Sequence, residues 1–345
     1  MIARTRLEEI LDQFSNLTIG VVGDLFLDRY LEITSDVHEL SVETELEAYQ
    51  IPVVRNSPGA AGTVMNNLTA LGVRSIVPVS VVGDDGHGYD LQQELSKLPV
   101  DSGKLISDPK RLTPTYTKPL RQDSEGQWTE LNRLDVRTRQ PLAAETTAQV
   151  CHHIQEVFSS TDGLIVLDQI NEKDWGVINT SVRQSLAKLS KANTDRLVFV
   201  DSRDHLALFD FGVLKGNRVE IFSAANRLGV DDQNVAQATS ALATKTGQPV
   251  FCTLGPDGIL VAQPGLPPGI TPGIPIQGPI DICGAGDSAT SGIVCAWLSG
   301  ATPLEAATIG NLIASITVQQ LGTTGTATPE QILDRCGESS AWIPK

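Results

Sequence analysis

Positively charged residues are scarce in this sequence. Only 26 Lys and Arg stand against 41 Asp and Glu, which gives a formal net charge of −15 at pH 7. Such a charge repels the phosphates of nucleic acids and of anionic membranes, so we expect neither as a partner. A small anionic ligand can still bind where local basic residues or backbone amides outweigh the overall field.

Cysteine is also sparse, and long hydrophobic runs are absent. The five cysteines are scattered and lie mostly in apolar stretches, which is typical of reduced core residues and not of a disulfide framework or a zinc site. No apolar run is long enough to span a membrane. The first 15 residues lack the uninterrupted apolar segment of a signal peptide. We therefore expect a cytoplasmic protein.

The 345 residues are enough for one large α/β domain. Apolar, β-branched runs that often end in Gly or Asp alternate with helical segments along most of the chain. This alternation is typical of a mostly parallel sheet with helices on both faces, so we predict a three-layer αβα architecture. The predicted strands are residues 17–24, 76–82, 163–168, 197–201, 219–224 and 249–254.

Two segments interrupt this alternation. Residues 31–54 and 116–134 contain short, polar, β-prone stretches, and residues 123–126 between two such stretches are typical of a hairpin turn. We predict that both segments form a small sheet that projects from the main domain as a lid or as a dimer surface. The chain would then be a single domain over residues 1–345 with these segments inserted in it.

The most informative motif is the segment 281–288. Gly284, Ala285 and Gly286 allow backbone N–H groups to converge on one point, and the helix that follows adds the positive end of its dipole, so the motif predicts an anion hole. Asp287 at its mouth would repel a phosphate unless it accepts a proton from an attacking hydroxyl group. Taken alone, the motif also fits a simple helix cap. A dinucleotide-binding turn is disfavoured, because the acidic residue at the required spacing, Glu305, begins a helix and does not end a strand.

Three other places carry candidate binding residues. Asp24 and Asp28 follow the first predicted strand, where an open α/β sheet binds ligands and where carboxylates suit sugar hydroxyls, although Asp24 could equally close a turn. The glycine-containing segment 253–258 follows a later strand and would let a nucleotide lie against the backbone, although a plain turn fits as well. Asn311 stands among apolar residues of a late helix, where the alternative is a satisfied buried amide.

Together these motifs resemble the ribokinase-like (PfkB) carbohydrate kinases over residues 15–335. The resemblance rests on Gly23-Asp24, Pro58-Gly59-Ala60-Ala61, 253–258 and 281–287, in the order of the family. Within the family, residues 22–30, 117–121, 133–135 and 321–323 look most like the kinase domain of the bacterial bifunctional heptose-phosphate kinase/adenylyltransferases. The resemblance implies a ribokinase-like fold and a kinase domain without the adenylyltransferase half.

The activity that the resemblance implies is ATP-dependent, in-line phosphorylation of a hydroxyl group on a small-molecule sugar or sugar phosphate. Asp287 would be the base, and Gly284, Ala285 and Gly286 would stabilise the transferred charge. Mg²⁺ would bridge the phosphates, with no protein ligand assigned to it, and a monovalent cation is a further candidate cofactor. The lid could pair two copies of the chain as a homodimer. The implied sugar-binding residues are Asp24, Asp28, Gly59, Ala60, Thr63, Lys118, Arg121 and Arg133, and the implied nucleotide-binding residues are Asn226, Thr253, Gly255, Gly258 and Asn311.

The basic residues of the second lid segment bear on the substrate. Lys118, Arg121 and Arg133 are unexpected in so acidic a chain if the lid meets only neutral sugars, and they would suit a clamp for a phosphate on the substrate. The alternative is a solvated hairpin with ordinary cross-strand charge pairs.

The sequence departs from the family at the sugar-binding motif. Ala60 replaces its second glycine, Thr63 replaces its asparagine, and Cys283 replaces a threonine before the anion hole. These changes keep a second hypothesis open, in which the chain is a degenerate member that binds nucleotide or sugar without turnover in a regulatory or scaffolding role.

A further departure concerns the Asn-x-x-Glu motif, which the family uses to organise Mg²⁺ and its waters. The motif aligns best on Asn226 and then places Gly229 where the glutamate belongs. A second match at Asn217–Glu220 would precede the predicted strand 219–224 and could not face the phosphates. The alignment on Asn226 predicts an unusually high Mg²⁺ requirement, with Asp231 or Asp232 as possible substitutes for the missing carboxylate. The alternative is that Glu220 or another carboxylate already fills the role.

Overall fold

The computed structural model describes residues 2–34, 38–230 and 234–339. Its main sheet has nine strands in the order β14-β13-β12-β11-β10-β9-β1-β4-β5, and all neighbours from β12 to β5 are parallel. Strands β13 and β14 add an antiparallel edge. The bounds are β1 Thr18–Gly23, β4 Ser75–Gly83, β5 Leu105–Asp108, β9 Gly163–Asp168, β10 Leu197–Ser202, β11 Val213–Asn217, β12 Val250–Thr253, β13 Ile259–Ala262 and β14 Gly269–Thr271.

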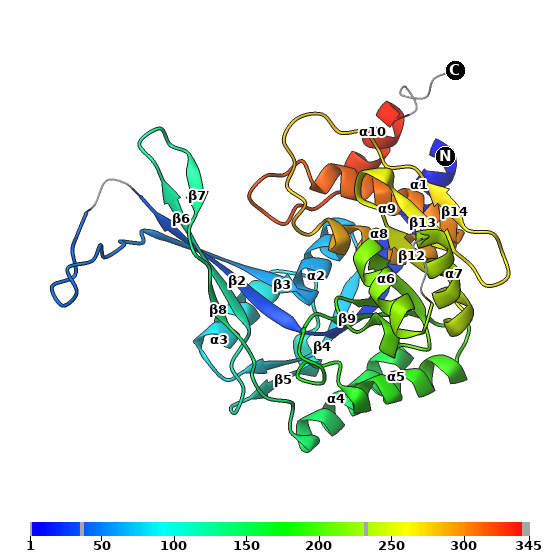
Figure 1. Cartoon of the computed structure of the whole chain (residues 1–345), viewed down its shortest axis with the longest axis horizontal. Helices are drawn as coiled ribbons and strands as arrows, with labels where there is room; N and C mark the ends of the chain where they lie inside the picture. Colours follow the sequence, from blue (N-terminus) through cyan, green and yellow to red (C-terminus); the bar gives the residue numbers. More distant parts are fainter. Residues whose placement is uncertain (1, 35–37, 231–233, 340–345) are drawn as a thin grey trace.

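Helices cover both faces of this sheet, as predicted (Figure 1). One apolar core joins the sheet to α1 Arg4–Asp12, α2 Ala61–Ala70, α3 Gly86–Leu95, α8 Ala285–Leu298, α9 Pro303–Thr317 and α10 Pro329–Ser339. The opposite core joins it to α4 Ala144–Ser160, α5 Thr180–Ala192, α6 Arg218–Arg227 and α7 Val235–Thr246. Alternate residues of one strand supply the two cores: in β9, Ile165 packs into the first and Leu164 into the second. None of the described helices has the length and apolarity to cross a membrane.

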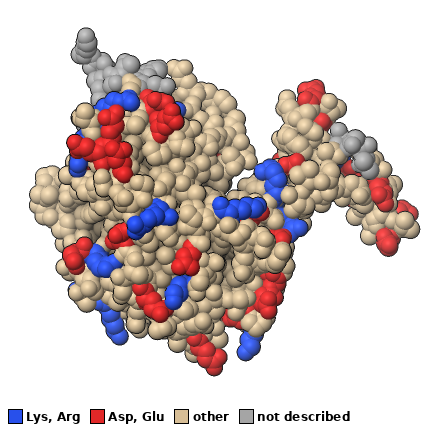
Figure 2. All heavy atoms as spheres, turned by 180° about the vertical axis from the view of Figure 1, so that it is seen from behind, with Lys and Arg blue, Asp and Glu red and all other residues tan. Residues whose placement is uncertain are grey.

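The lid is a second sheet of five strands that stands away from the main body (Figures 1 and 2). Strands β2 and β6 are parallel neighbours, and β3, β7 and β8 pair with them in antiparallel fashion. The lid is confirmed, but it begins at Leu25, directly after β1, and not at residue 31. Its strands are β2 Leu25–Ile33, β3 Val53–Ala60, β6 Thr115–Gln122, β7 Trp128–Glu130 and β8 Leu134–Val136.

One predicted strand is wrong. Residues 219–224 lie in helix α6, and the strand before it is β11, Val213–Asn217. Asn217 is the N-cap of α6, and its carboxamide and the Glu220 side chain form a reciprocal capping box. The apolar residues from 219 onward therefore belong to a helix whose start was readable from Asn217 and Glu220.

The expectation that the cysteines are core residues holds only in part. Cys252 and Cys295 are buried, Cys151 and Cys336 are half-buried, and Cys283 is exposed. Within the described residues none of the five forms a disulfide.

Candidate active site

The segment before α8 forms the tight turn that the sequence predicts. Gly284 has φ +78° and is the N-cap of α8, a conformation that glycine adopts without strain. The Asp281 carboxylate holds the turn, because it accepts the backbone N–H of Cys283 at 2.9 Å and that of Gly322 at 3.1 Å. The turn is thereby fixed to the loop that follows α9.

The first turn of α8 offers backbone N–H groups to an anion. Ala285 already donates its N–H to the carbonyl of Ile282 at 3.2 Å. The N–H groups of Gly286 and Asp287 belong to the first helical turn, where no intrahelical acceptor is available. Together with the positive end of the helix dipole, they form a site suited to a phosphoryl group.

Asp287 stands in this first turn and is half-buried. Burial, reinforced by the nearby Asp201 carboxylate, raises the pKa of Asp287 to about 7, although Lys215 acts in the opposite direction. A carboxylate with this pKa accepts a proton readily near neutral pH, as a general base requires.

A buried ion pair lies under the anion hole, and sequence reasoning missed it. Lys215 on β11 and Asp201 on β10 are each 5% exposed, and their Nζ and Oδ2 atoms are 2.7 Å apart. Thr290 on α8 donates its hydroxyl to the same Asp201 oxygen at 2.9 Å. A Cβ atom added to Gly286 would lie 3.1 Å from Lys215 Nζ. The ammonium group therefore sits directly against the backbone of the hole.

The charges around Lys215 favour its protonated form. Burial opposes the charge, but the neighbouring carboxylates, with Asp201 the strongest, outweigh burial and raise the pKa of Lys215. The only sequence signal for this cluster was the aspartate at the end of the predicted strand 197–201. Lys215 itself lies in the strand that was not predicted.

The Asn-x-x-Glu motif lies at the carboxyl end of a strand after all. Asn217 ends β11, and the Glu220 carboxylate accepts the Asn217 N–H at 2.6 Å, beside the Lys215–Asp201 pair. Burial and the Asp201 carboxylate raise the pKa of Glu220. Asn226 instead lies within α6 and Gly229 follows that helix, so the strand on which the alignment with Asn226 was based is absent, and the match at Asn217–Glu220 is the one that follows a strand. Asp231 and Asp232, the possible substitutes for a carboxylate at 229, lie outside the described residues.

On the lid, Asp28 of β2 is buried beside Lys118 of β6. Lys118 Nζ lies 3.7 Å from Asp28 Oδ1, and it donates to the Tyr30 hydroxyl at 3.3 Å. A Cβ atom added to Gly59 would lie 2.8 Å from Asp28 Oδ2, so only glycine lets β3 approach this carboxylate. Burial raises the pKa of Asp28, and Lys118 partly offsets this effect.

Helix α2 connects the lid to the anion hole. Ala60 is its N-cap and has φ +54°, a backbone conformation that is strained for a residue with a Cβ atom. Thr63 in the first turn of α2 is buried, and its methyl group would lie 3.4 Å from a Cβ atom added to Gly284. The two motifs that the sequence separates by more than 200 residues therefore touch.

Asp24, directly after β1, binds backbone groups of the loop that follows β9. Its carboxylate accepts the backbone N–H of Val177 at 2.7 Å and that of Gln169 at 3.3 Å. Burial raises the pKa of Asp24 to about 6, although the hydrogen bond from Val177 opposes this rise. Both oxygens thus hold the loop after β9, which supports the structural alternative for this residue.

The three basic lid residues do not form one cluster. Arg133 stacks on the Tyr116 ring at 4.1 Å, on the strand face that carries Lys118. Arg121 lies three residues from Lys118 on β6, so it faces the other side, where it pairs with Glu47 at 2.9 Å. Lys118 and Arg133 alone therefore share the face of Asp28.

The segment 253–258 and Asn311 both approach Thr271 at the end of β14. Gly255 and Gly258 have φ +62° and +100°, and a Cβ atom on Gly258 would lie 2.0 Å from the Thr271 carbonyl oxygen. The Asn311 amide donates to the same carbonyl at 3.1 Å and to the Thr271 hydroxyl at 2.9 Å. Asn311 is thus a satisfied buried amide that holds the edge of the sheet. Thr253 ends β12 and pairs with Ile259 of β13.

No preformed metal site is present in the described part of the chain, where no three His, Cys, Asp or Glu side chains are placed to hold an ion. Asp287, Asp201 and Glu220 are the carboxylates that act on Lys215 at the anion hole. Since Asp201 is bound to Lys215 and Thr290, Glu220 is the better candidate for contact with a metal that a nucleotide brings.

Comparison with known proteins gives concordant results. The family model described as pfkB family carbohydrate kinase matches residues 20–331. A bifunctional protein HldE of Trichlorobacter lovleyi is 30% identical over 340 residues, which cover 96% of this chain and 65% of that protein. The bifunctional protein HldE of Desulfatibacillum aliphaticivorans is 28% identical over 317 residues, or 90% of this chain and 61% of that protein. The chain therefore spans somewhat less than two thirds of these relatives.

Solved structures share the fold at low sequence identity. The ribokinase of Arabidopsis thaliana, solved with ribose and ATP, is 19% identical with a TM-score of 0.64, and the alignment covers 92% of this chain and 98% of that one. The tetrameric inhibited form of phosphofructokinase-2 from Escherichia coli is 17% identical with a TM-score of 0.69, covering 94% and 99%. These likenesses confirm the predicted ribokinase-like fold with its β lid.

Proposed function

Because the chain belongs to the pfkB family of carbohydrate kinases, we propose that it transfers the terminal phosphoryl group of ATP to a hydroxyl group of a sugar or sugar phosphate. The observation that carries this proposal is Asp287, a carboxylate of raised pKa in the first turn of α8. It combines a proton acceptor with an anion site at one point of the fold.

In the proposed reaction the sugar lies between the lid and α8. Asp28 accepts hydrogen bonds from sugar hydroxyl groups, and Asp287 takes the proton of the hydroxyl that attacks the terminal phosphorus in line with the leaving ADP oxygen. The Asp28 charge contributes to the raised pKa of Asp287, after burial and the Asp201 carboxylate, which supports a sugar that contacts both carboxylates.

Lys215 stabilises the charge of the transferred group from beneath. Its ammonium group adjoins the backbone of Gly286, so a phosphoryl group bound at the hole is attracted by the cation as well as by the N–H groups. Asp201 and Thr290 fix the ammonium group in position.

Mg²⁺ would be held chiefly by the nucleotide phosphates and would neutralise their charge. Glu220 is the residue of this chain that we assign to it, through water, because its carboxylate lies at the carboxyl end of β11 beside the anion hole. Five assignments to the nucleotide remain predictions: Asn226, Thr253, Gly255, Gly258 and Asn311. Asn226 was chosen because it would follow a strand, but it lies within helix α6.

We further propose that the substrate already carries a phosphate. Lys118 and Arg133 share one face of the lid with Asp28, and a phosphate there would gain two cationic partners. Arg133 is also paired with Asp135, at 2.6 and 2.9 Å, so a phosphate would share its guanidinium group with that carboxylate. Arg121 is left out of this clamp because it lies on the opposite face of the lid, where it pairs with Glu47.

A non-catalytic role is the competing hypothesis. The strained Ala60 and the buried Thr63 favour it, since both depart from the sugar-binding motif of the family. The position of Asn217 and Glu220 weighs against it, because this Asn-x-x-Glu sequence lies at the end of β11, beside the Lys215–Asp201 pair.

A turnover assay tests the two hypotheses directly. ADP release is measured with ATP, Mg²⁺ and a panel of free and phosphorylated sugars, beside nucleotide binding by thermal shift. We expect turnover with a phosphorylated sugar, and a loss of about 10²–10⁴ in kcat for Asp287→Asn with ATP binding retained. A kcat within about threefold of the parent would remove Asp287 from the mechanism. ATP binding without turnover on any sugar would establish the non-catalytic role.

A further inference from the structure

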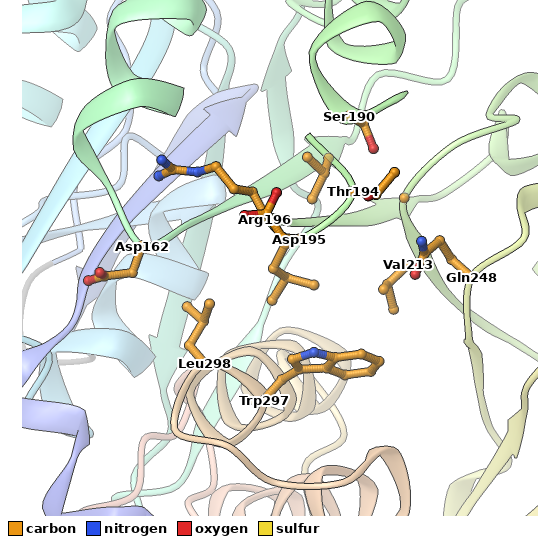
Figure 3. Close-up of a pocket in the computed structure, with 12 residues that line it drawn as sticks. Asp162, Ser190, Thr194, Asp195, Arg196, Val213, Gln248, Trp297 and Leu298 are labelled. Carbon is orange, nitrogen blue, oxygen red and sulfur yellow. The ribbon is translucent and has the colours of Figure 1, made fainter. Parts of the chain in front are cut away.

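A cavity lies at the amino ends of strands of the main sheet, whereas Asp287 lies near their carboxyl ends. Its volume is about 330 Å³, and it opens where β9, β10 and β11 begin and where α8 ends (Figure 3). This volume is at the small end of the range of small-molecule sites, about 300–1,000 Å³. The cavity shares no lining residue with the proposed phosphoryl-transfer site.

One wall of this cavity is apolar and belongs to the last turn of α8. Leu298 packs on the backbone of Gly163, where an added Cβ atom would lie 3.1 Å from its side chain. Trp297 rests against the Phe251 ring at 5.9 Å and is only half-buried. The nitrogen-bearing edge of its indole ring faces the space that the other lining residues border (Figure 3).

The facing wall carries polar side chains whose hydrogen-bonding groups are not used within the protein. Ser190, Thr194, Asp195 and Gln248 line the cavity, and in the described part of the chain their side chains have no hydrogen-bond or ion-pair partner. Hydroxyl and amide groups both donate and accept hydrogen bonds, and the Asp195 carboxylate accepts them. A ligand that meets this wall must therefore offer donors and acceptors together.

The cavity does not suit an anion. Its one cationic lining residue, Arg196, donates to the Thr161 carbonyl and stacks on the Phe158 ring at 5.0 Å. In Figure 3 its guanidinium group extends away from Trp297. Asp162 also lines the cavity and accepts the Thr18 N–H at 2.7 Å. The carboxylate left unpaired, that of Asp195, would repel a phosphate and attract an ammonium group.

We propose that this cavity is a second ligand site, which binds a non-phosphorylated saccharide and prefers an amino sugar. The hydroxyl groups of a sugar match the mixed donors and acceptors of the polar wall, and its C–H surface matches Trp297 and Leu298. An amino group pairs with Asp195. Helix α8 thus separates two sites: its first turn carries Asp287, and its last turn, about 15 Å away by the helical rise, carries Trp297.

Tryptophan fluorescence and saturation-transfer NMR test this site with glucosamine, glucose and glucose 6-phosphate as probes. Glucosamine should bind about tenfold more tightly than glucose, which is about 1.4 kcal/mol, and glucose 6-phosphate more weakly than either. Trp297→Phe should lose the fluorescence change, whereas Trp128→Phe, which removes an exposed tryptophan of the lid, should keep it. Asp195→Asn should abolish the preference for glucosamine.

Two further variants separate this cavity from the lid. Thr194→Tyr changes an exposed residue and fills the cavity, so it should abolish NMR transfer to glucosamine without unfolding the protein. Asp28→Asn should leave glucosamine binding unchanged. The proposal is overturned if no probe binds saturably at millimolar concentration, or if binding survives in Thr194→Tyr and disappears in Asp28→Asn.

Discussion

The ammonium group of Lys215 lies 2.7 Å from the carboxylate of Asp201, in a buried position against the backbone of Gly286. A buried ion pair gains little stability overall, because the desolvation of two charges offsets their attraction. Its position therefore argues for a role in binding the transferred phosphoryl group. Lys215 gives this acidic chain a local cation at the anion hole, where we propose that the phosphoryl group binds.

We expect Lys215→Met to change the pH dependence of activity. The Lys215 charge lowers the pKa of Asp287, which stands at about 7. The base must be deprotonated, so kcat/KM rises as the pH rises through this pKa. Without the cation the pKa increases, and the acidic limb of the profile should move to higher pH while kcat falls.

The pH at which the acidic limb lies distinguishes the change in the pKa of Asp287 from a loss of stability. Removal of Lys215 leaves Asp201 buried and unpaired, which destabilises the fold by about 3–5 kcal/mol, so the profile is measured where the variant is folded. Lys191→Met, which removes an exposed lysine paired with Asp210, is the control and should leave the limb in place. An acidic limb that does not move in Lys215→Met would contradict the proposed coupling.

The Mg²⁺ dependence of turnover should follow Glu220. Glu220→Gln keeps an oxygen that can accept the Asn217 N–H in the capping box, but it removes the charge proposed to hold the waters of the metal. We expect half-saturation at several-fold higher free Mg²⁺. Gly229→Glu, on the loop after α6, should leave half-saturation unchanged. The reverse pattern would restore the alignment on Asn226.

Strong local signals made much of the fold predictable. The strands β1, β9 and β10 are β-branched apolar runs that end in Gly, Asp or Ser, and the anion-hole turn is a local sequence of small residues. Strand β11 was not predicted, because its last three residues, Lys215, Gly216 and Asn217, are not apolar or β-branched. Lys215 can be buried in this strand only because it pairs with Asp201, and Asp201 comes from another strand, β10.

The lid shows the same limit. Its position and hairpin followed from the sequence, and alternation along β6 puts Lys118 and Arg121 on opposite faces. Which of these two faces also carries Asp28 depends on the register of β2 and β6. For Asp24 the sequence leaves a sugar ligand and a structural role equally open, because the backbone groups that its carboxylate binds are 145 and 153 residues away and leave no local pattern.

Ala60→Gly should stabilise the protein. Ala60 has φ +54°, and relief of this strain, about 1–2 kcal/mol, exceeds the entropic cost of glycine, about 0.5–1 kcal/mol. We expect a gain of about 0.5–1 kcal/mol in the free energy of unfolding, measured by urea titration. Ala70→Gly, at the other end of α2, should instead lose stability. Equal losses in the two variants would show that Ala60 is not strained.

A homodimer through the lid predicts that charge on its exposed apolar residues weakens association. Val42 and Leu46 are 93% and 70% exposed, and apolar side chains grouped on a projecting element are typical of an interface. Val42→Asp with Leu46→Asp should shift the mass from dimer to monomer in light scattering. Leu266→Asp, between β13 and β14, is the control. A parent protein that is monomeric at all concentrations would refute the proposal.

The phosphate clamp predicts a selective effect of the lid cations on phosphorylated substrates. Lys118→Ala and Arg133→Ala should each raise KM for a phosphorylated sugar about tenfold or more, the loss of one charge-assisted contact of about 1.5–3 kcal/mol, and should change KM for the free sugar much less. Arg121→Ala lies on the same strand but on the opposite face, paired with Glu47, so it should leave both KM values nearly unchanged. Lys118 also adjoins Asp28, and a general disturbance of the sugar site would raise both KM values by one factor. Equal factors in Lys118→Ala and Arg133→Ala would therefore refute the clamp, whereas a selective rise in both, absent from Arg121→Ala, can come only from contact with the phosphate of the substrate.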